Sequence, residues 1–337
     1  MIGSALDRLI ERAVVPSFTS IGPAIRRRLF DWSPLEGHDL SGRVVVLSGG
    51  TSGIGEAAAG LFAGCGATLE IVGRDAGRTR ALAETLRERS GNLAVDAVIA
   101  DLGRPDEVRA AARTLAGRHS RIDVLAHNAG ALFPRRRRAA DGTDLAVELM
   151  VAAPFLLTGL LLPRLRAGPT SRVLTMSSGG MYTEPPSVRG LQMSDEDYDG
   201  AAQYARAKRA QVTLNALWAA RVPPDEVVFH ALHPGWVDTP GLGEALPIFS
   251  RSLSSLGLLR SARDGADTLV WLAADERALA SSGDFWLDRE PRPVHRTRRT
   301  RAADTPERRD ALWRWCEEHT GWSLARERTP VGRPGRA

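Results

Sequence analysis

The chain has 337 residues, of which 43% are hydrophobic and 25% are charged, so it carries enough apolar material for one large domain and is not a disordered protein. Its formal net charge is +5, but the excess arginines are crowded into residues 26–28, 135–138 and 292–301. Such runs are typical of solvated loops, and because no nucleic-acid-binding module accompanies them, no nucleic-acid partner is expected. The two cysteines lie far apart in sequence, which excludes a disulfide framework, predicts no metal site and fits a reducing cytoplasm.

The first 15 residues alternate charged and apolar side chains and lack the compact apolar core of a secretory signal. They predict either an arm that packs on the domain or an amphipathic helix that lies on a membrane surface, and both alternatives stay open. The longest apolar run, residues 151–162, is interrupted by Pro154 and is too short to span a bilayer. We therefore expect a cytoplasmic protein without a transmembrane segment, and association with a membrane surface stays open.

Short β-branched runs alternate with helical patterns from residue 43 onward. Strands are expected at 43–48, 68–72, 94–100, 122–127, 172–176, 227–232 and 284–287, and helices at 57–63, 77–88, 106–118, 144–165 (bent near Pro154), 201–220 and 262–274. This alternation predicts an α/β fold, a doubly wound parallel sheet with helices on both faces and ligands beyond the carboxyl ends of the strands. Residues 1–40 are expected to form an N-terminal arm, 41–290 the nucleotide-binding domain, and 291–337 an arginine-rich tail with a short helix at 306–319.

A glycine-rich turn, residues 48–55, follows the first strand and precedes a helix. Glycines there let the backbone approach a pyrophosphate, and the helix N-terminus supplies N–H donors and positive potential. The spacing is G-x-x-x-G-x-G rather than G-x-G-x-x-G. The turn predicts a dinucleotide cofactor, and its candidate binding residues are Ser48, Gly49, Thr51, Ser52, Gly53, Ile54 and Gly55.

The ends of the next strands carry further candidate cofactor-binding residues. Arg74, after the second strand, is suited to a ribose 2′-phosphate and favours NADP(H), while the adjacent Asp75 leaves NAD(H) open. Asp101 and Leu102, after the third strand, are placed for the adenine edge. The small residues around Asn128, after the fourth strand, let the backbone pass the cofactor; this N-A-G motif consists of Asn128, Ala129 and Gly130.

Tyr204 and Lys208 are the candidate catalytic pair. They are four residues apart on an expected helix and so share one face. A tyrosine with a pKa of about 10 is a poor base near neutrality, and a nearby ammonium is expected to lower that pKa into the range useful for acid–base chemistry. Lys208 is the only lysine in the chain, all other non-histidine basic residues being arginine. Since lysine and arginine are not interchangeable where a compact ammonium is needed, this position is expected to carry chemistry.

Two loops complete the candidate site. Ser178, with Ser177 as the alternative, follows the fifth strand and is placed to steady a substrate oxygen while Tyr204 exchanges its proton. After the sixth strand, a proline and a glycine turn the chain towards the cofactor, and a threonine is placed to bond the nicotinamide amide or a phosphate. The candidate cofactor-binding residues of this loop are Pro234, Gly235, Val237 and Thr239.

Taken in order, these motifs resemble the short-chain dehydrogenase/reductase family over residues 40–290. Residues 177–181, 233–236 and 285–289 further resemble its retinol-dehydrogenase-like branch, and within that branch the dehydrogenase/reductase member 12 group. The resemblance implies one Rossmann-type domain with about seven strands in the order 3-2-1-4-5-6-7, often assembled as a homo-oligomer. It also implies hydride transfer between NAD(P)(H) and a carbonyl or alcohol, for which the cofactor supplies the organic chemistry.

Three positions depart from the family's pattern. Ser48 replaces a threonine, and His127 stands where asparagine is more frequent. Met150 aligns with the family's tetrad asparagine, which supports a water chain to the lysine, and methionine cannot take over this hydrogen bonding.

Three functions stay open. The first is an NADP(H)-dependent oxidoreductase with an apolar carbonyl or alcohol substrate under a lid formed by residues 240–259. The second is a cofactor-binding sensor or scaffold with weak or no catalysis, because of Met150. The third is a membrane-surface or nucleic-acid binder that uses the arginine runs and would show salt-dependent binding.

Overall fold

The computed structural model describes residues 2–239, 243 and 247–327. Its sheet has eight strands in the order β3-β2-β1-β4-β5-β6-β7-β8, which confirms the doubly wound α/β fold and the expected seven-strand order. The added strand, β8, pairs antiparallel with β7 at the edge of the sheet. The strands are β1 Val44–Ser48, β2 Thr68–Gly73, β3 Val95–Ile99, β4 Val124–His127, β5 Ser171–Met176, β6 Val227–Leu232, β7 Phe285–Leu287 and β8 Glu290–Pro291.

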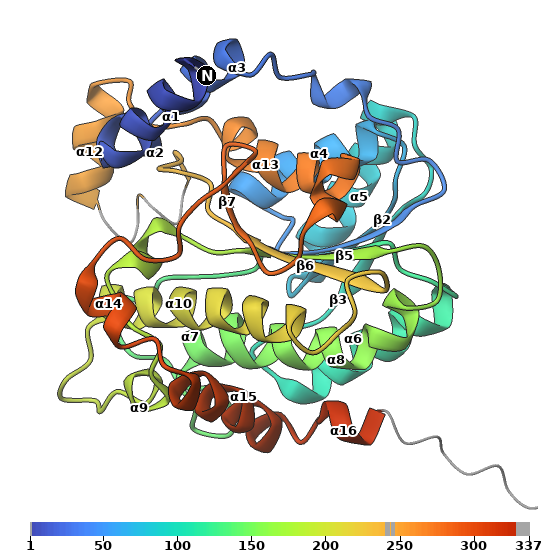
Figure 1. Cartoon of the computed structure of the whole chain (residues 1–337). Coiled ribbons are helices and arrows are strands. Elements are labelled where there is room, and N and C mark those ends of the chain that lie inside the picture. The colour runs from blue at the N-terminus through green and yellow to red at the C-terminus, as the bar shows by residue number, and fades with distance from the viewer. Residues whose placement is uncertain (1, 240–242, 244–246, 328–337) are drawn as a thin grey trace, which may run out of the picture.

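Helices cover both faces of this sheet (Figure 1). One face packs on α4 Gly53–Gly64, α5 Ala76–Ser90 and α13 Ala262–Ala274, and the other on α6 Pro105–Arg118, α8 Ala153–Leu165 and α10 Gly200–Ala219. Strands β5 and β6 are buried at every position, as two-sided coverage requires, and β6 also has the nearly continuous apolar sequence that is typical of such strands. The shorter elements are η1 Leu35–Gly37, η3 Gly179–Tyr182, α9 Val188–Leu191, α12 Pro247–Ser255 and η4 Glu276–Ala280.

The expected helix at 144–165 is present but is not uniform. It starts as α7 Leu145–Val147, widens into a π turn, η2 Glu148–Ala152, and continues as α8, so the irregularity lies just before Pro154. Among the described residues, the helix 145–165, which contains the run 151–162, is long and apolar enough to cross a membrane, and its most apolar window has a mean hydropathy of 2.2. This window is 78% buried, between the sheet and the C-terminal helices. The absence of a transmembrane segment stays a prediction.

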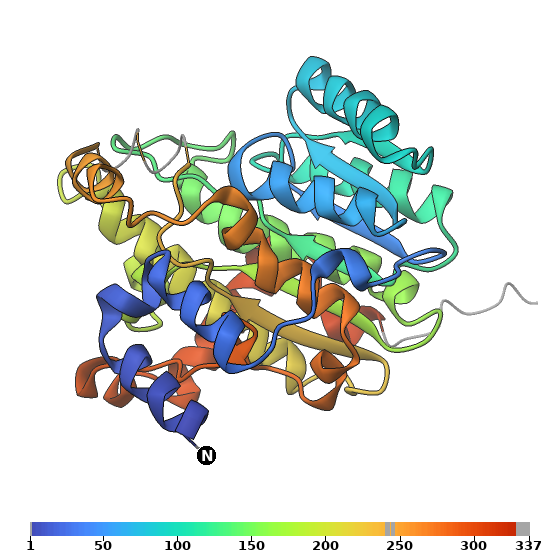
Figure 2. The same ribbon diagram turned by 90° about the horizontal axis from the view of Figure 1, so that it is seen from above.

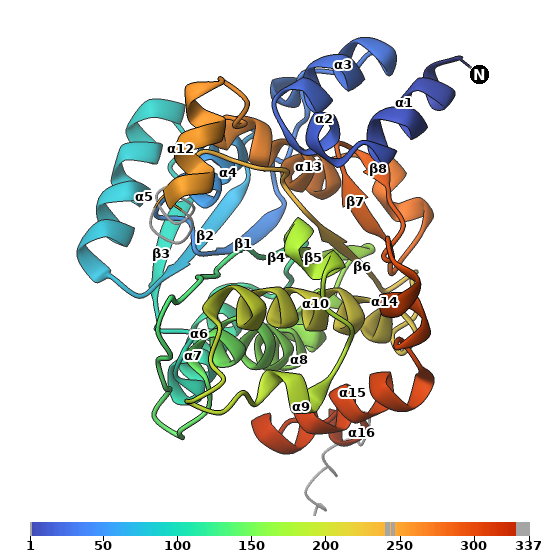
Figure 3. The same cartoon turned by 90° about the vertical axis from the view of Figure 1, so that its left-hand side faces the viewer.

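The N-terminal residues form three helices, α1 Ile2–Arg12, α2 Val14–Phe18 and α3 Ile21–Leu29, which lie beside β7 and β8 (Figure 3) and at the opposite end of the molecule from α5 (Figure 2). Buried ion pairs hold them there. Arg26 is fully buried and donates to Asp7 (2.7 Å) and to Asp288 (2.5 Å), and Asp288 also accepts from Arg260 (2.5 Å). Removing one member of such a network leaves a buried charge unpaired and costs about 3–5 kcal/mol.

Asp288 and Arg289 form the two-residue turn between β7 and β8, and both have positive φ, 55° and 58°. Two left-handed residues are what a tight hairpin turn with the correct twist needs, although glycine or asparagine is usual there. Here both side chains are held by ion pairs, because Arg289 also donates to Asp267 at 2.7 Å. The network that docks the N-terminal helices therefore also stabilises the strained turn.

The C-terminal residues form α14 Arg298–Ala302, α15 Pro306–Thr320 and α16 Leu324–Glu327. Helix α15 packs beneath α10 (Figure 1), and Trp313 and Trp322 stand edge-on to Phe155 of α8 at ring distances of 5.0 and 5.5 Å. Residues from both flanks of 41–290 therefore share the hydrophobic core of the sheet. The division of the chain at residues 40 and 290 stays a prediction.

Candidate active site

A cavity of about 900 Å³ opens at the carboxyl ends of the strands, where a doubly wound sheet binds its ligands. It brings together residues from eight separated stretches of the chain. Every candidate site residue except Ser48 lines it: Gly49, Thr51, Ser52, Gly53, Ile54, Gly55, Arg74, Asp101, Leu102, Asn128, Ala129, Gly130, Ser178, Tyr204, Lys208, Pro234, Gly235, Val237 and Thr239.

In the glycine-rich turn, backbone atoms lie too close to one another to leave room for side chains, which explains why glycines occupy it. A Cβ on Gly55 would lie 2.0 Å from the carbonyl oxygen of Gly49, and Gly49 itself has a φ of +72°, a conformation open mainly to glycine. Ser52 is the extended N-cap residue of α4 and makes no side-chain capping bond. The first turn of α4 therefore presents its N–H groups to the cavity, as an anion-binding site needs.

Ser48 is buried behind this turn instead of lining the cavity. Its Oγ accepts from the backbone N–H groups of Asn128 (3.1 Å) and Ala129 (3.2 Å). In return, the Asn128 side-chain amide donates to the carbonyl oxygens of Ser48 (3.2 Å) and Gly49 (2.9 Å). Ser48 and Asn128 thus lock the ends of β1 and β4 together and fix the shape of the glycine turn.

Arg74 is exposed at the cavity wall, and Asp75 beside it is the N-cap of α5. The Asp75 carboxylate accepts from the backbone N–H of Arg78 at 2.9 Å, and its pKa is held low mainly by this bond. Arg78 also lines the cavity, a residue that the sequence analysis did not single out. The carboxylate is therefore engaged locally, and two guanidinium groups face this end of the cavity.

Asp101 and Leu102 lie where β3 leaves the sheet. One carboxylate oxygen of Asp101 accepts from the backbone N–H of Gly103 at 2.9 Å, and its own N–H donates to Glu107 at 2.7 Å. These bonds shape the loop and hold Asp101 and Leu102 against the cavity. Gly103 belongs to the same wall, and a Cβ there would lie 2.6 Å from Leu145.

Tyr204 and the two serines are brought together at the start of α10. The phenol of Tyr204 and the side chain of Ser178 both line the cavity, and the Oγ of Ser178 accepts from the N–H of Gly180 at 3.3 Å. Ser177 is buried and its Oγ donates to the backbone carbonyl of Lys208 at 3.0 Å. The geometry therefore favours Ser178 over Ser177 as the hydroxyl that faces a substrate.

Lys208 is 2% exposed and its Nζ donates to the carbonyl oxygen of Met176 at 2.7 Å. Burial lowers the pKa of this ammonium from 10.5 to about 7. Its Nζ lies 5.4 Å from the ring centroid of Tyr204, and burial raises the pKa of the Tyr204 phenol above 10, with the Ser178 side chain acting in the opposite direction. The prediction that the pKa of Tyr204 is lowered is therefore wrong for this structure. Desolvation of the phenolate raises the pKa by more than the neighbouring groups lower it.

Met150 lies in the π turn and is fully buried. A Cβ placed on Gly130 would lie 3.2 Å from its sulfur and 3.3 Å from Nζ of Lys208, so the thioether and the ammonium flank the same glycine. His127, another of the three departures, bonds Thr158 at 2.8 Å inside the protein, and burial lowers its pKa to about 3. Like Ser48, Met150 and His127 therefore lie behind the cavity wall.

The N-terminal helices support two loops of the site. Phe18 packs against Gly179, where a Cβ would lie 2.8 Å from its ring, and edge-on to Trp236 at 5.7 Å. Its carbonyl oxygen accepts from the N–H of Trp236 at 2.7 Å. Because Trp236 lines the cavity, Phe18 positions the site without facing it. No local sequence pattern identified this role.

Residues 234–239 close the other side of the cavity. A Cβ on Gly53 would lie 3.1 Å from the Thr239 methyl group, which places Thr239 beside the glycine turn, near the expected phosphates. Val237 forms a parallel β-bridge with Arg260 and holds the loop in place. Six residues of the expected lid at 240–259, namely 240–242 and 244–246, lie outside the described residues, and α12 forms most of the remainder.

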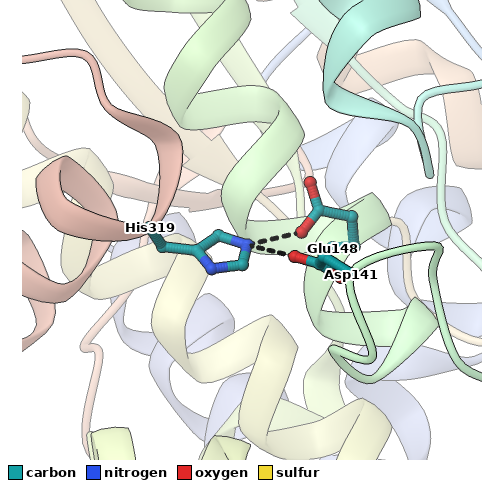
Figure 4. Close-up of side chains that lie close together, drawn as sticks. All are labelled: Asp141, Glu148 and His319. Carbon is teal, nitrogen blue, oxygen red and sulfur yellow. Dashed lines mark hydrogen bonds and ion pairs between the residues drawn. The ribbon is translucent and has the colours of Figure 1, made fainter.

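The C-terminal helix α15 reaches the π turn through His319, which points at Glu148 and Asp141 (Figure 4). Its Nε2 lies 2.7 Å from the buried Glu148 carboxylate and 3.6 Å from that of Asp141. The Glu148 bond raises the pKa of His319 above 6.5. Two carboxylates and an imidazole can coordinate a divalent cation. The 2.7 Å distance, however, is an ordinary hydrogen-bond length, so His319 and Glu148 form a hydrogen-bonded ion pair.

The sequence profile of the short chain dehydrogenase family matches residues 43–246. Human dehydrogenase/reductase SDR family member 12 is 38% identical over 264 residues, which cover 77% of this chain and 81% of the relative. DnrU from Streptomyces sp. (strain C5), a candidate daunorubicin C-13 ketoreductase, is 37% identical over 76% of this chain and 86% of its own length. Human retinol dehydrogenase 12 is 29% identical over 83% and 90%.

Solved structures share the fold. A protein from Mycobacterium paratuberculosis superposes with a TM-score of 0.68 at 25% identity, over 87% of this chain and 98% of its own. A short chain dehydrogenase from Escherichia coli CFT073, solved in complex with NADPH, gives a TM-score of 0.61 at 22% identity, over 77% of this chain and 100% of its own. Fold, site geometry and sequence similarity agree, and the chain belongs to the short-chain dehydrogenase/reductase family of oxidoreductases.

Proposed function

We propose that this chain is an NADP(H)-dependent oxidoreductase that interconverts a carbonyl and an alcohol on an apolar substrate. One observation carries the proposal: the side chains of Tyr204, Ser178 and the only lysine line the same cavity as the glycine-rich turn. A dinucleotide held on the turn would extend along the cavity towards these groups. Binding and chemistry are thus joined in one space of about 900 Å³.

The residues present fit such a cofactor. The glycine turn is a cradle that a side chain would fill, and the uncapped first turn of α4 offers N–H donors to phosphate oxygens. Arg74 and Arg78 both line the far end of the cavity, while Asp75 is engaged in capping α5. Guanidinium groups suit a 2′-phosphate, so we propose NADP(H) as the preferred cofactor and keep NAD(H) as the alternative.

The proposed catalytic roles follow from the contacts. Tyr204 exchanges a proton with the substrate oxygen, and Ser178, on the same cavity wall, orients that oxygen. Lys208, with a pKa lowered to about 7, exchanges its own proton near neutrality and is placed to hold ribose hydroxyls. When bound, the nicotinamide supplies or accepts the hydride.

The part of the cavity beyond Tyr204 supports an apolar substrate. Its wall includes Leu132, Phe133, Leu149 and Trp236, which favour apolar contact over hydrogen bonding. Human retinol dehydrogenase 12 is named for retinol, an apolar alcohol, and the candidate ketoreductase DnrU is named for the C-13 ketone of daunorubicin. A cytoplasmic location, a homo-oligomeric state and peripheral membrane contact remain predictions.

A second candidate function is a cofactor-binding sensor or scaffold with little turnover. The observation that favours it is the Met150 sulfur, which lies beside Gly130 and close to Lys208 where the resemblance expects an asparagine. A thioether neither donates a hydrogen bond nor accepts one strongly. A relay that passed through that position would be interrupted.

The test is NADPH oxidation with a panel of apolar aldehydes and ketones, after binding of NADPH and NADH has been followed by fluorescence. Tyr204→Phe should abolish turnover and keep binding, while Tyr198→Phe, which removes a phenol outside the cavity wall, should keep both. Binding without turnover on any substrate would favour the sensor. Failure to bind either cofactor would refute both functions.

Cofactor preference has its own test. Arg74→Ser should weaken NADPH binding by about tenfold or more, the loss of one charge-assisted contact, and leave NADH binding nearly unchanged. Arg80→Ser is the matched control, since Arg80 is exposed on α5 but does not line the cavity. Equal weakening of both cofactors would contradict a role for Arg74 in 2′-phosphate recognition.

A further inference from the structure

Helix α1 is inverted relative to an ordinary surface helix. It buries a carboxylate, Asp7, and turns Glu11 inward, where both meet Arg26 at 2.7 and 3.1 Å. Leu6 and Leu9 are 40% and 62% exposed instead. Besides these charges α1 buries one apolar side chain, Ile10, so Leu6 and Leu9 remain exposed among the described residues. Exposed apolar clusters mark contact surfaces.

Other exposed apolar side chains continue this surface. Val14 and Val15 are the first two residues of α2, and Ile21 is the first residue of α3. Ser20 bonds the backbone oxygens of residues 257 and 258, which brings Leu256, 69% exposed, next to the same corner. We call the six residues Leu6, Leu9, Val14, Val15, Ile21 and Leu256 the apolar face.

The exposed charges of α1–α3 are all basic, and one of them, Arg27, is paired with Asp264 of α13 at 2.5 Å. Within residues 2–29 the only acidic side chains are Asp7 and Glu11, and both are engaged with arginines on their inner side. The exposed charged residues of this segment are Arg8, Arg12, Arg27 and Arg28. At about 100° per residue, Arg12 lies about 60° and Arg8 about 100° from Leu9 in the same direction, so both border the exposed apolar side of α1 along one edge. An apolar stripe with a basic border is complementary to an anionic lipid surface.

We propose that α1–α3 and the end of α12 bind the surface of an anionic lipid bilayer, with the apolar face inserted at the level of the headgroups. Figures 1 and 3 show α12 and α1–α3 on the same side of the molecule. Through Phe18 and Trp236 this surface adjoins the cavity wall. Uptake of an apolar substrate from the bilayer would rest on the proposed function, whereas lipid binding itself does not.

A second copy of the chain is the competing occupant. In a twofold contact the same patch meets itself, so the exposed arginines of one copy would approach those of the other. Like charges brought together at an interface oppose association. Charge complementarity therefore selects the anionic bilayer.

The experiment is co-flotation with vesicles of phosphatidylcholine containing about 30% phosphatidylglycerol, compared with phosphatidylcholine alone, at low and high salt. The wild-type protein should bind the anionic vesicles, and less so at high salt. Leu9→Gln should weaken partitioning by about tenfold, as expected for losing one inserted leucine. Leu93→Gln, at a residue that is 82% exposed ahead of β3, is the matched control and should bind like the wild type.

Thermal unfolding and NADPH binding of both variants should equal those of the wild type, since neither leucine is buried. Equal vesicle binding by Leu9→Gln and the wild type would overturn the proposal, as would equal binding to neutral and anionic vesicles. So would a dimer that Leu9→Gln dissociates, observed by sedimentation without any vesicle binding. Turnover of a water-soluble aldehyde without vesicles tests the proposed function separately.

Discussion

Replacing Lys208 with methionine is expected to change how the stability of the protein depends on pH. The ammonium is 2% exposed, and burial lowers its pKa from 10.5 to about 7. One pKa unit corresponds to about 1.4 kcal/mol, so a charged Lys208 costs the folded state about 5 kcal/mol relative to a neutral one. Methionine keeps the straight chain and removes the charge.

The direction follows from proton counting. Between pH 7 and 10.5 the unfolded chain holds a proton on Lys208 that the folded protein has lost, so the free energy of unfolding of the wild type rises with pH across this window. From about pH 7 to about pH 9, Lys208 raises the free energy of unfolding of the wild type by about 2–3 kcal/mol. Below pH 7 both states are protonated and the contribution is constant.

The assay is urea unfolding of wild type and Lys208→Met without cofactor at about pH 6, 7, 8 and 9. The wild-type free energy minus that of the variant should rise by about 2–3 kcal/mol across the range, since every other titrating group is common to both proteins. Arg206→Met, on the same helix, is the control. Its difference in free energy of unfolding from the wild type should not change with pH, because arginine stays protonated at these pH values. A difference independent of pH would refute the reasoning and mean that the Met176 carbonyl solvates the ammonium as well as water does.

The remaining predictions concern the C-terminal helices. Gly159→Ala should destabilise the protein by about 1–3 kcal/mol in urea unfolding, because its Cβ would lie 2.4 Å from the Trp322 ring. The same change at Gly117, an exposed helical site with free space around it, should be neutral or stabilising, and equal effects at the two sites would contradict the packing argument. His319→Gln should lower the free energy of unfolding by about 1–3 kcal/mol at pH 5.5 and by less at pH 9. Glu148 is the chief cause that raises the pKa of His319, so the stabilising charge of the imidazole is lost as the pH rises through this raised pKa. A loss of stability that does not depend on pH would show that the charge of the imidazole is immaterial.

The sequence predicted the fold closely, because the core follows local periodicity. Each expected strand agrees with its observed bounds within two residues, and the helix at 262–274 agrees at both ends. The π turn at 148–152 escaped prediction, since its extra residue per turn is set by packing and not by a local pattern. The antiparallel β8 was missed for a similar reason, because its turn uses Asp288 and Arg289 in place of the usual glycine or asparagine.

The candidate site could be predicted where a residue's place follows from a glycine-rich turn or from the carboxyl end of a strand. Ser48 was chosen for its place in the motif, but its hydroxyl faces inward to hold Asn128. The sign of the Tyr204 pKa shift was wrong because it depends on burial, which spacing along a helix does not reveal. Phe18 was missed because its contacts with residues 179 and 236 span more than 150 residues of sequence.

Helices α1–α3 are made well before the partners that fix them to the sheet. Arg26 and Asp288 are separated by 262 residues, and at a synthesis rate of 5–20 residues per second Asp288 follows about 13–50 s later. Until then Arg26 has only Asp7 and Glu11 of α1 as counter-charges, and the carboxylate that joins α3 to the edge of the sheet is missing. The loops that Phe18 supports therefore reach their final place only after β7 and β8 are made, and a nascent chain without these strands lacks a finished nucleotide site.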